Sequence, residues 1–169
     1  MQLPVSFDHN EWFVLISFVI NFVLVFLLPR RFPRSVVILI FLFSAVVARL
    51  CDHLLAGPNF DFYNLMDTGE YDLFDMFTYF LYMPFAYFFV YYYDKWKLKG
   101  YSILVYVVAT ALAGTAYELL TVYFDVFNYN EWKIYYSFAV YLIIQPLTLL
   151  FFEFLKKNYS GVDAFSLKH

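Results

Sequence analysis

The sequence predicts an all-α polytopic membrane protein, folded as one bundle of five transmembrane helices. The 169 residues are 63% hydrophobic and only 15% charged, whereas a soluble domain is about 45–50% apolar and about 25% charged. Five separate segments are mostly apolar over about 20 residues, the length that crosses a hydrocarbon layer about 30 Å thick. Lysine and arginine also gather in alternate turns between these segments, as they do on the cytoplasmic side of membrane proteins.

The composition excludes several other classes of protein. A soluble chain of this length buries about 70% of its unfolded surface, which is too little to hide a sequence that is 25% aromatic. Only 5 Gly, 6 Pro and 1 Cys are present, so collagen-like, disordered and disulfide-scaffold classes are excluded. The formal net charge of −3 argues against nucleic acid as a partner. The first residues lack a positively charged segment, so no cleavable signal peptide is expected.

The predicted spans follow one another with short connections. In chain order they are residues 12–28, 36–55, 73–93, 101–124 and 134–155. Pro29 closes the first span and Gly57-Pro58 closes the second. Continuous apolar runs such as residues 36–43 lack the alternation of a barrel strand, so the spans are expected to be helices. We expect one domain over residues 1–157 and a mobile cytoplasmic tail at residues 158–169.

The distribution of basic residues predicts the orientation in the membrane. Nine of them fall on one predicted side: Arg30, Arg31, Arg34, Lys95, Lys97, Lys99, Lys156, Lys157 and Lys168. The opposite side carries only Lys133, and Arg49 lies inside a span. Because basic loops stay in the cytoplasm, the N-terminus is predicted outside and the C-terminus inside. The lipid bilayer is therefore the first expected partner.

Polar side chains within the spans are predicted to face the bundle interior, because an ionisable residue at the centre of a membrane helix costs about 2.5–3.5 kcal/mol. In the fourth span, small and polar residues recur every three or four positions around Glu118. A similar stripe in the fifth span contains Ser137 and Tyr141. A rise of 1.5 Å per residue places five ionisable residues near the outer half of the bundle. The predicted polar cluster consists of Arg49, Asp52, His53, Asp75 and Glu118, with Asn21 and Gln145 nearer the midplane.

Several functions are compatible with this polar cluster. The preferred hypothesis is a non-enzymatic membrane module that binds a small ligand, a lipid or a partner protein through an outward-facing pocket. A second is an intramembrane enzyme acting on a lipid or isoprenoid, with Glu118 as acid/base and Arg49 holding an anionic group. A transporter or channel subunit comes third, since carboxylates do not continue toward the cytoplasm below Glu118. The cluster could also only join helices, with Arg49 pairing with Glu118 or Asp52, at about 0.6–2 kcal/mol per contact.

The sequence predicts neither catalytic residues nor a cofactor. Asp52, His53, Asp75 and Glu118 are metal-ligating residue types, but the paired His or Cys spacing of a metal site is missing, so no metal is predicted. No Gly-x-Ser-x-Gly motif or phosphate-binding glycine loop occurs either. His53 by itself is more typical of a histidine at a helix end than of a ligand.

The segment from Tyr117-Glu118 to Phe138 carries a resemblance to a group of proteins. It has a glutamate near the outer end of the fourth span, a polar turn with Trp132-Lys133, and Tyr-Ser-Phe opening the fifth span. In these features it resembles small five-span membrane proteins of unknown function from spore-forming bacteria. The resemblance covers the last third of the chain. It implies a multi-pass protein of the bacterial cytoplasmic membrane and implies no activity.

Overall fold

The computed structural model describes residues 7–56, 62–66 and 73–159 and contains a helix at each predicted span. The helices are α1 (His9–Leu27), α2 (Arg34–Leu55), α3 (Leu73–Lys95), α4 (Tyr101–Tyr123) and α5 (Ile134–Asn158). Within the described residues, four of them, α1, α2, α4 and α5, are long and apolar enough to cross a membrane. Helix α3 has sufficient length, but six tyrosines between Tyr79 and Tyr93 lower its mean hydropathy.

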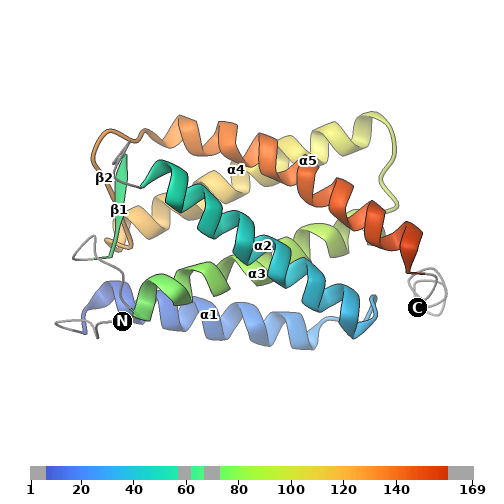
Figure 1. The fold of residues 1–169 in the computed structure, drawn as a ribbon, viewed down its shortest axis with the longest axis horizontal. Helices are drawn as coiled ribbons and strands as arrows, with labels where there is room; N and C mark the ends of the chain where they lie inside the picture. The colour runs from blue at the N-terminus through green and yellow to red at the C-terminus, as the bar shows by residue number, and fades with distance from the viewer. Residues whose placement is uncertain (1–6, 57–61, 67–72, 160–169) are drawn as a thin grey trace.

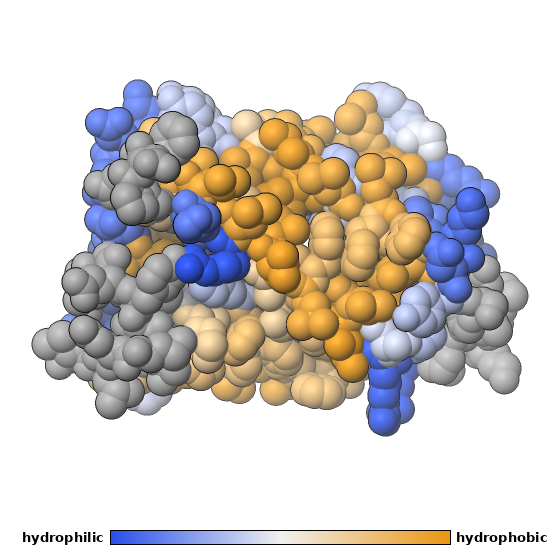
Figure 2. Space-filling view, in the orientation of Figure 1, coloured by the Kyte–Doolittle hydropathy of each residue, from blue (hydrophilic) through white to orange (hydrophobic). Residues whose placement is uncertain are grey.

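The five helices lie side by side along one long axis and alternate in direction (Figure 1). Helix α3 packs against α1 and α2, and α4 packs against α5. The α1–α2 and α3–α4 turns lie at the same end of the bundle as the last turn of α5, and α1 begins at the opposite end (Figure 1). In space filling, the middle of the molecule is a hydrophobic belt between two hydrophilic ends (Figure 2). Such a belt is the surface expected of a membrane-embedded protein.

Helix boundaries differ from the predicted ones at both ends of the chain. Helix α1 begins three residues early because the Glu11 carboxylate accepts a hydrogen bond of 2.8 Å from the Asp8 backbone N–H, which is half of a capping box. Helix α5 continues to Asn158 because its last turns pack inward, with Phe152 and Leu155 buried. The predicted mobile tail therefore begins within a helix, and its residues 160–169 lie outside the described part of the chain.

The end of the bundle that carries the two turns is held together by a buried carboxylate. Asp94, near the end of α3, is only 5% exposed. Its carboxylate accepts hydrogen bonds from Arg31 Nε at 2.5 Å and from Lys156 Nζ at 2.9 Å. Arg31 also donates to the Asp94 carbonyl at 3.1 Å. One carboxylate thus joins the α1–α2 turn, α3 and α5, and we call this contact the basic-end clamp.

The opposite end carries a small sheet that the sequence analysis did not predict. Strand β1 (Tyr63–Leu65) pairs antiparallel with β2 (Phe127–Tyr129), and we call the pair the lid. In its register, Tyr63 faces Tyr129, Asn64 faces Asn128 and Leu65 faces Phe127. Because side chains alternate between the faces of a sheet, the two tyrosines point to the same side. Tyr63, Leu65 and Phe127 are buried, so this apolar face covers the end of the helices.

Candidate functional site

An elongated cavity of about 360 Å³ lies between α2, α3, α4 and α5, next to the lid. This volume falls in the range of small-molecule sites, about 300–1,000 Å³. Along α2 the lining runs from Asp52, near the lid, back to Phe43, which is about 13 Å at 1.5 Å per residue. Along α4 it runs from Glu118 to Tyr106, about 18 Å. The cavity therefore follows the long axis of the bundle.

The two ends of this cavity differ in chemistry. The end near the lid contains both carboxylates, Asp52 and Glu118, together with Ser137 and several tyrosines. The rest of the lining is mainly apolar and aromatic, and includes Phe43, Val47, Phe88, Phe89 and Ile144. A polar head and an apolar tail on one molecule would each meet a matching environment.

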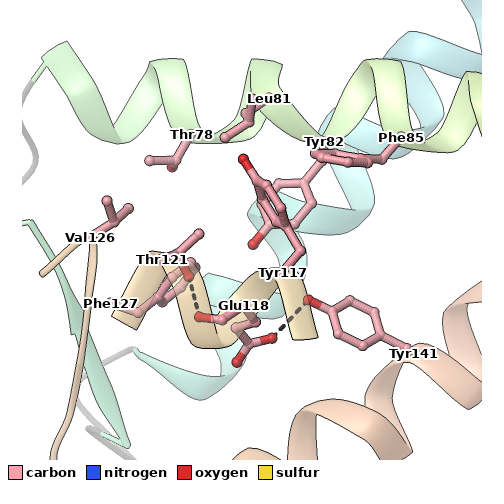
Figure 3. A pocket seen from close by; sticks show the side chains of 10 residues that line it. All are labelled: Thr78, Leu81, Tyr82, Phe85, Tyr117, Glu118, Thr121, Val126, Phe127 and Tyr141. Atoms are coloured by element: carbon pink, nitrogen blue, oxygen red, sulfur yellow. Dashed lines mark hydrogen bonds between the residues drawn. The ribbon is translucent and has the colours of Figure 1, made fainter. Parts of the chain in front are cut away.

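Three hydroxyl groups hold the Glu118 carboxylate at the polar end. Tyr129 and Ser137 donate to Oε1, the latter at 2.5 Å, and Tyr141 donates to Oε2 at 2.7 Å. Figure 3 shows the Tyr141 hydroxyl directed at the carboxylate from α5. The indole of Trp132 extends this network by donating to Ser137 Oγ at 2.7 Å. Glu118 thus joins α4, α5 and the lid, and only 8% of it is exposed.

The second carboxylate, Asp52, is held in a similar way from α2. The Tyr63 hydroxyl of the lid donates to Asp52 Oδ1 at 2.6 Å. The hydroxyl of Tyr79 on α3 also hydrogen-bonds to Asp52. Arg49 donates to this Tyr79 hydroxyl at 3.4 Å, and its guanidinium carbon lies 5.7 Å from the centre of the Tyr79 ring. A chain of hydrogen bonds through Tyr79 therefore connects Arg49 to the polar end of the cavity.

The lid connects the two carboxylates through its facing pair of tyrosines. Tyr63 donates to Asp52 and its cross-strand partner Tyr129 donates to Glu118. Burial raises the pKa of the Tyr63 hydroxyl well above its ordinary value, and the charge of Asp52 raises it further. Burial also raises the pKa of Tyr129, with the hydrogen bond to Glu118 as the second cause. Both tyrosines therefore remain hydrogen-bond donors at neutral pH.

The Tyr63 contact predicts a pH-dependent stability. Below about pH 10 the hydroxyl is protonated in both folded and unfolded chains, and Tyr63→Phe should cost about 1.5–3 kcal/mol, the worth of a hydrogen bond to a charged group. At higher pH the unfolded wild type loses this proton while the folded state keeps it, so the advantage of wild type should shrink by about 1.4 kcal/mol per pH unit. Unfolding of both proteins in neutral detergent between pH 8 and 11 measures the difference between their free energies of unfolding. A difference that stays constant to pH 11 would contradict the prediction.

A second, small cavity lies beside Glu118, with a volume of about 20 Å³. This is enough for about one water molecule. Figure 3 shows it surrounded by side chains of α3, α4, α5 and the segment that enters β2, with Tyr82 and Phe85 approaching from α3. It shares Glu118, Tyr141 and these two rings with the large cavity. The polar end of the site therefore has room beside the carboxylate.

The structure brings some of the predicted cluster together and separates the rest. Asp52, Glu118 and Gln145 line the same cavity, whereas Arg49 is not among its lining residues and donates to the Tyr79 hydroxyl. The side chain of His53 is exposed, one residue after the buried Asp52. Asn21 is buried on α1, where it donates to the Ser17 carbonyl of its own helix at 2.7 Å. Asp75 belongs to α3, and its side chain lies outside the described part of the structure.

Gln145 joins α5 to α4 at the wall of the cavity. Its amide nitrogen donates to the Thr110 hydroxyl at 2.9 Å and to the Val107 carbonyl at 2.8 Å. The Thr110 hydroxyl in turn donates to the Tyr106 carbonyl at 2.7 Å. Gln145 thus has partners on α4 and serves mainly to hold the wall in place.

The role of the lid tyrosines was not predicted from the sequence. Ser137 and Tyr141 were on the predicted polar stripe of the fifth span, and this periodicity is the signal that locates them. Tyr63 and Tyr129 lie in loops, where aromatic residues are typical of a membrane interface. Their pairing depends on a contact between positions 66 residues apart, which no local pattern reports.

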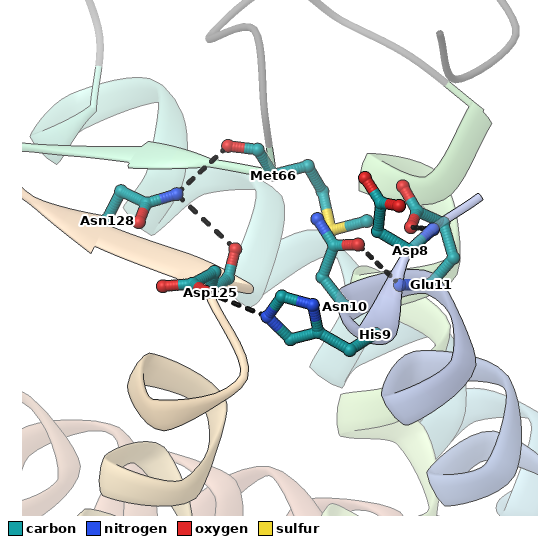
Figure 4. A network of polar contacts seen from close by, with 7 residues as sticks. All are labelled: Asp8, His9, Asn10, Glu11, Met66, Asp125 and Asn128. Carbon is teal, nitrogen blue, oxygen red and sulfur yellow. Dashed lines mark hydrogen bonds and ion pairs between the residues drawn. The ribbon is translucent and has the colours of Figure 1, made fainter. Parts of the chain in front are cut away.

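A polar network outside the cavity secures the lid end. His9 Nε2 lies 2.8 Å from Asp125 Oδ2, an exposed hydrogen-bonded pair between α1 and the α4–β2 turn (Figure 4). The Asn128 amide donates to the Met66 carbonyl at 3.1 Å and to the Asp125 carbonyl at 3.3 Å. Among the side chains that the structure describes, no group of three or more His, Cys, Asp or Glu residues is placed to hold a metal ion. These contacts support the lid from the side of α1.

Comparison with known proteins finds no matching family model, no matching curated protein and no matching solved structure. The fold and the site define the class of protein: a helical bundle in which four of the described helices are long and apolar enough to cross a membrane, with a cavity bordered at one end by a two-stranded lid.

Proposed function

We propose that this protein is a non-enzymatic membrane module that binds a small amphipathic ligand, such as a single-chain lipid, in its elongated cavity. The observation that carries the proposal is the chemical gradient along the cavity, from Asp52 and Glu118 near the lid to phenylalanine and aliphatic side chains deeper in the bundle. Its volume of about 360 Å³ supports a ligand rather than water alone. We further propose that the protein resides in a bacterial cytoplasmic membrane, with the cavity near its outer leaflet.

The proposed topology has five spans, with the N-terminus outside. Helix α3 is counted as a span, in addition to the other four, because it runs the full length of the bundle beside α1 and α2 (Figure 1). A helix that is covered by neighbouring helices can cross the membrane with a lower mean hydropathy. The direction follows from the positive-inside rule. Eight basic residues gather at the end that carries the clamp: Arg30, Arg31, Arg34, Lys95, Lys97, Lys99, Lys156 and Lys157.

Single cysteines test this topology. Cys51 is the one cysteine of the chain, so a Cys51→Ser background accepts one new thiol at a time. We expect a membrane-impermeant maleimide to label Asn130→Cys in intact cells and to label Lys97→Cys only after the cells are opened. Both positions are exposed and lie at opposite ends of the bundle. Labelling of both from outside would contradict five spans, and the reverse pattern would contradict the orientation.

The alternative function as an enzyme has less support. Acid/base catalysis by Glu118 requires a carboxylate oxygen that can exchange a proton with a substrate. Tyr129 and Ser137 engage one oxygen and Tyr141 engages the other. Such a carboxylate is better suited to holding a polar head group in place.

A pair of matched variants tests ligand binding. Val47 lines the cavity, whereas its neighbour Val46 is 64% exposed on the apolar belt. Phenylalanine at position 47 should fill part of the cavity, and the same change at position 46 should meet only lipid. Native mass spectrometry of protein purified from membranes should find one amphiphile bound to wild type and to Val46→Phe, and at least ten-fold less on Val47→Phe. Bare protein in all three samples, or equal occupancy in the two variants, would count against a ligand in this cavity.

A further inference from the structure

We infer that the ligand of this cavity carries a positively charged head group, so that the site takes a single-chain amphiphile with an ammonium or similar cation. This inference rests on the proposed binding function and specifies its chemistry. It draws on three separate features of the described residues: the charge at the polar end, the aromatic rings around it, and the shape of the apolar part.

The polar end contains more negative than positive charge. Asp52 and Glu118 both line it, are at most 9% exposed and are close enough for their charges to interact. None of the described side chains that line the cavity belongs to a lysine, arginine or histidine. Arg49 donates to the Tyr79 hydroxyl and its charge also acts on Asp52, so it supplies one positive charge for two carboxylates. Because unbalanced charge away from water is costly, a cation at Glu118 would stabilise this end.

Aromatic rings surround the place where such a cation would lie. Tyr82, Phe85 and Tyr117 border the small cavity beside Glu118 together with Tyr141 and Phe127. Figure 3 shows Tyr82 and Phe85 on α3 close to the Tyr117 ring of α4, and the Tyr141 hydroxyl of α5 directed at the Glu118 carboxylate. The faces of tyrosine and phenylalanine rings attract cations by about 0.5–2 kcal/mol each. A cage of this kind, combined with a carboxylate, favours an ammonium group over a hydroxyl and repels an anionic head.

The apolar part sets the size and shape of the tail. By the measure in which about 20 Å³ holds one water molecule, a volume of about 360 Å³ has room for a chain of many methylene groups. The lining extends for about 13 Å along α2 and about 18 Å along α4. A narrow space of this length suits one unbranched chain of about ten to twelve carbons better than a compact ring system.

Three amphiphiles with the same tail test the inference: dodecylammonium, dodecanol and dodecanoate. Cys51 lines the cavity next to Asp52 and is the chain's sole thiol, so its alkylation by a small maleimide reports occupancy in wild-type protein held in neutral maltoside micelles at pH 7. We expect dodecylammonium to slow alkylation at concentrations at least ten-fold lower than the other two. Native mass spectrometry of the same samples counts the bound amphiphile directly. It therefore also reports occupancy if Cys51 reacts slowly in the ligand-free protein.

Variants assign this preference to the carboxylates. Glu118→Gln and Asp52→Asn should each reduce the preference for dodecylammonium over dodecanol at least ten-fold, with dodecanol binding retained as evidence of a folded cavity. Asp125→Asn removes an acid outside the cavity and should leave the preference unchanged. If either cavity variant fails to fold, the wild-type ranking of the three head groups decides the question.

The possible outcomes separate the inference from the proposed function. Equal binding of the three amphiphiles, or stronger binding of dodecanol or dodecanoate, would overturn the cationic head group and leave a cavity that binds amphiphiles. Failure of all three to bind would overturn both. Selective binding of dodecylammonium that persists in Glu118→Gln and Asp52→Asn would also overturn the inference, because the attraction would then lie outside this site.

Discussion

Replacing Asp94 with asparagine is expected to lower the free energy of unfolding by about 3 kcal/mol. In the wild type this buried carboxylate binds Arg31 and Lys156 and thereby joins three segments of the chain. The amide keeps the shape but not the charge, and it leaves two cations facing each other. Removing one partner from a buried ion pair typically costs about 3–5 kcal/mol, and partial exposure of Lys156 moves the expected value to the lower limit. Reversible unfolding in mixed micelles, followed by circular dichroism, measures the change.

The exposed ion pair at the other end of the bundle offers a matched control. Asp125 bonds to His9, and both side chains are about 60% exposed. The backbone of Asp125 has a φ of +55°, which asparagine also tolerates. Asp125→Asn should therefore cost less than 1 kcal/mol, as surface ion pairs do. If the two variants lose similar amounts of unfolding free energy, burial does not determine how much the clamp contributes to stability.

Replacing Glu118 with alanine is expected to cost about 3–5 kcal/mol. The change removes the acceptor of three hydrogen bonds, from Tyr129, Ser137 and Tyr141. Each buried donor left without a partner costs about 1–3 kcal/mol, and rearrangement among the hydroxyls recovers part of this. The thermal midpoint in detergent should fall, and hydrogen exchange at β2 should become faster because Tyr129 no longer anchors the lid.

A double-mutant cycle shows whether this loss comes from the hydroxyl network. Tyr141→Phe alone should cost about 1.5–3 kcal/mol, because it removes one bond to a charged acceptor. In the Glu118→Ala background the same change should cost almost nothing, since the Tyr141 hydroxyl has already lost that acceptor. Additive losses would mean that the two residues act separately, and the hydrogen bond between them would then contribute little to the stability of α4 against α5.

The two largest expected losses lie at opposite ends of the bundle, and they have different physical causes. The clamp at Asp94 joins two cations to one buried carboxylate, so salt should screen it much less than an exposed pair. The network at Glu118 is built from neutral donors around one carboxylate, so salt should affect it little. Comparing both variants with Asp125→Asn at low and high ionic strength therefore separates the buried contacts from the exposed one.

Local patterns in the sequence were sufficient to predict the helices. Apolar segments of span length predicted each of them, and the ends differ by no more than about three residues. At the start of α1 the difference arises from a cap at Asp8 and Glu11, and at the end of α5 from inward packing of Phe152 and Leu155. Residues 73–93 were predicted as a span and do form α3, but this helix is not among the four apolar enough to cross a membrane, because its tyrosines lower its mean hydropathy.

The candidate site could be predicted only in part. Helical periodicity and depth brought Asp52, Glu118 and Gln145 to one region, and these three do line the cavity. His53 was assigned to the same helix face as Asp52, but successive residues on a helix point about 100° apart, and its side chain is exposed. Arg49 shares the face of Asp52, but it does not line the cavity, and its guanidinium donates to the Tyr79 hydroxyl of α3.

By itself, the sequence determined that the chain forms long apolar helices, where each of them runs, and which carboxylates lie within them. These properties depend on residues within a turn or two of one another, and hydropathy and helical periodicity report them. The tertiary structure alone decided that two loops pair into a lid, that Tyr63 and Tyr129 each bind one carboxylate, and that the interior contains a cavity. Each of these depends on how side chains from distant segments pack and on the space they leave unfilled, which no local pattern encodes.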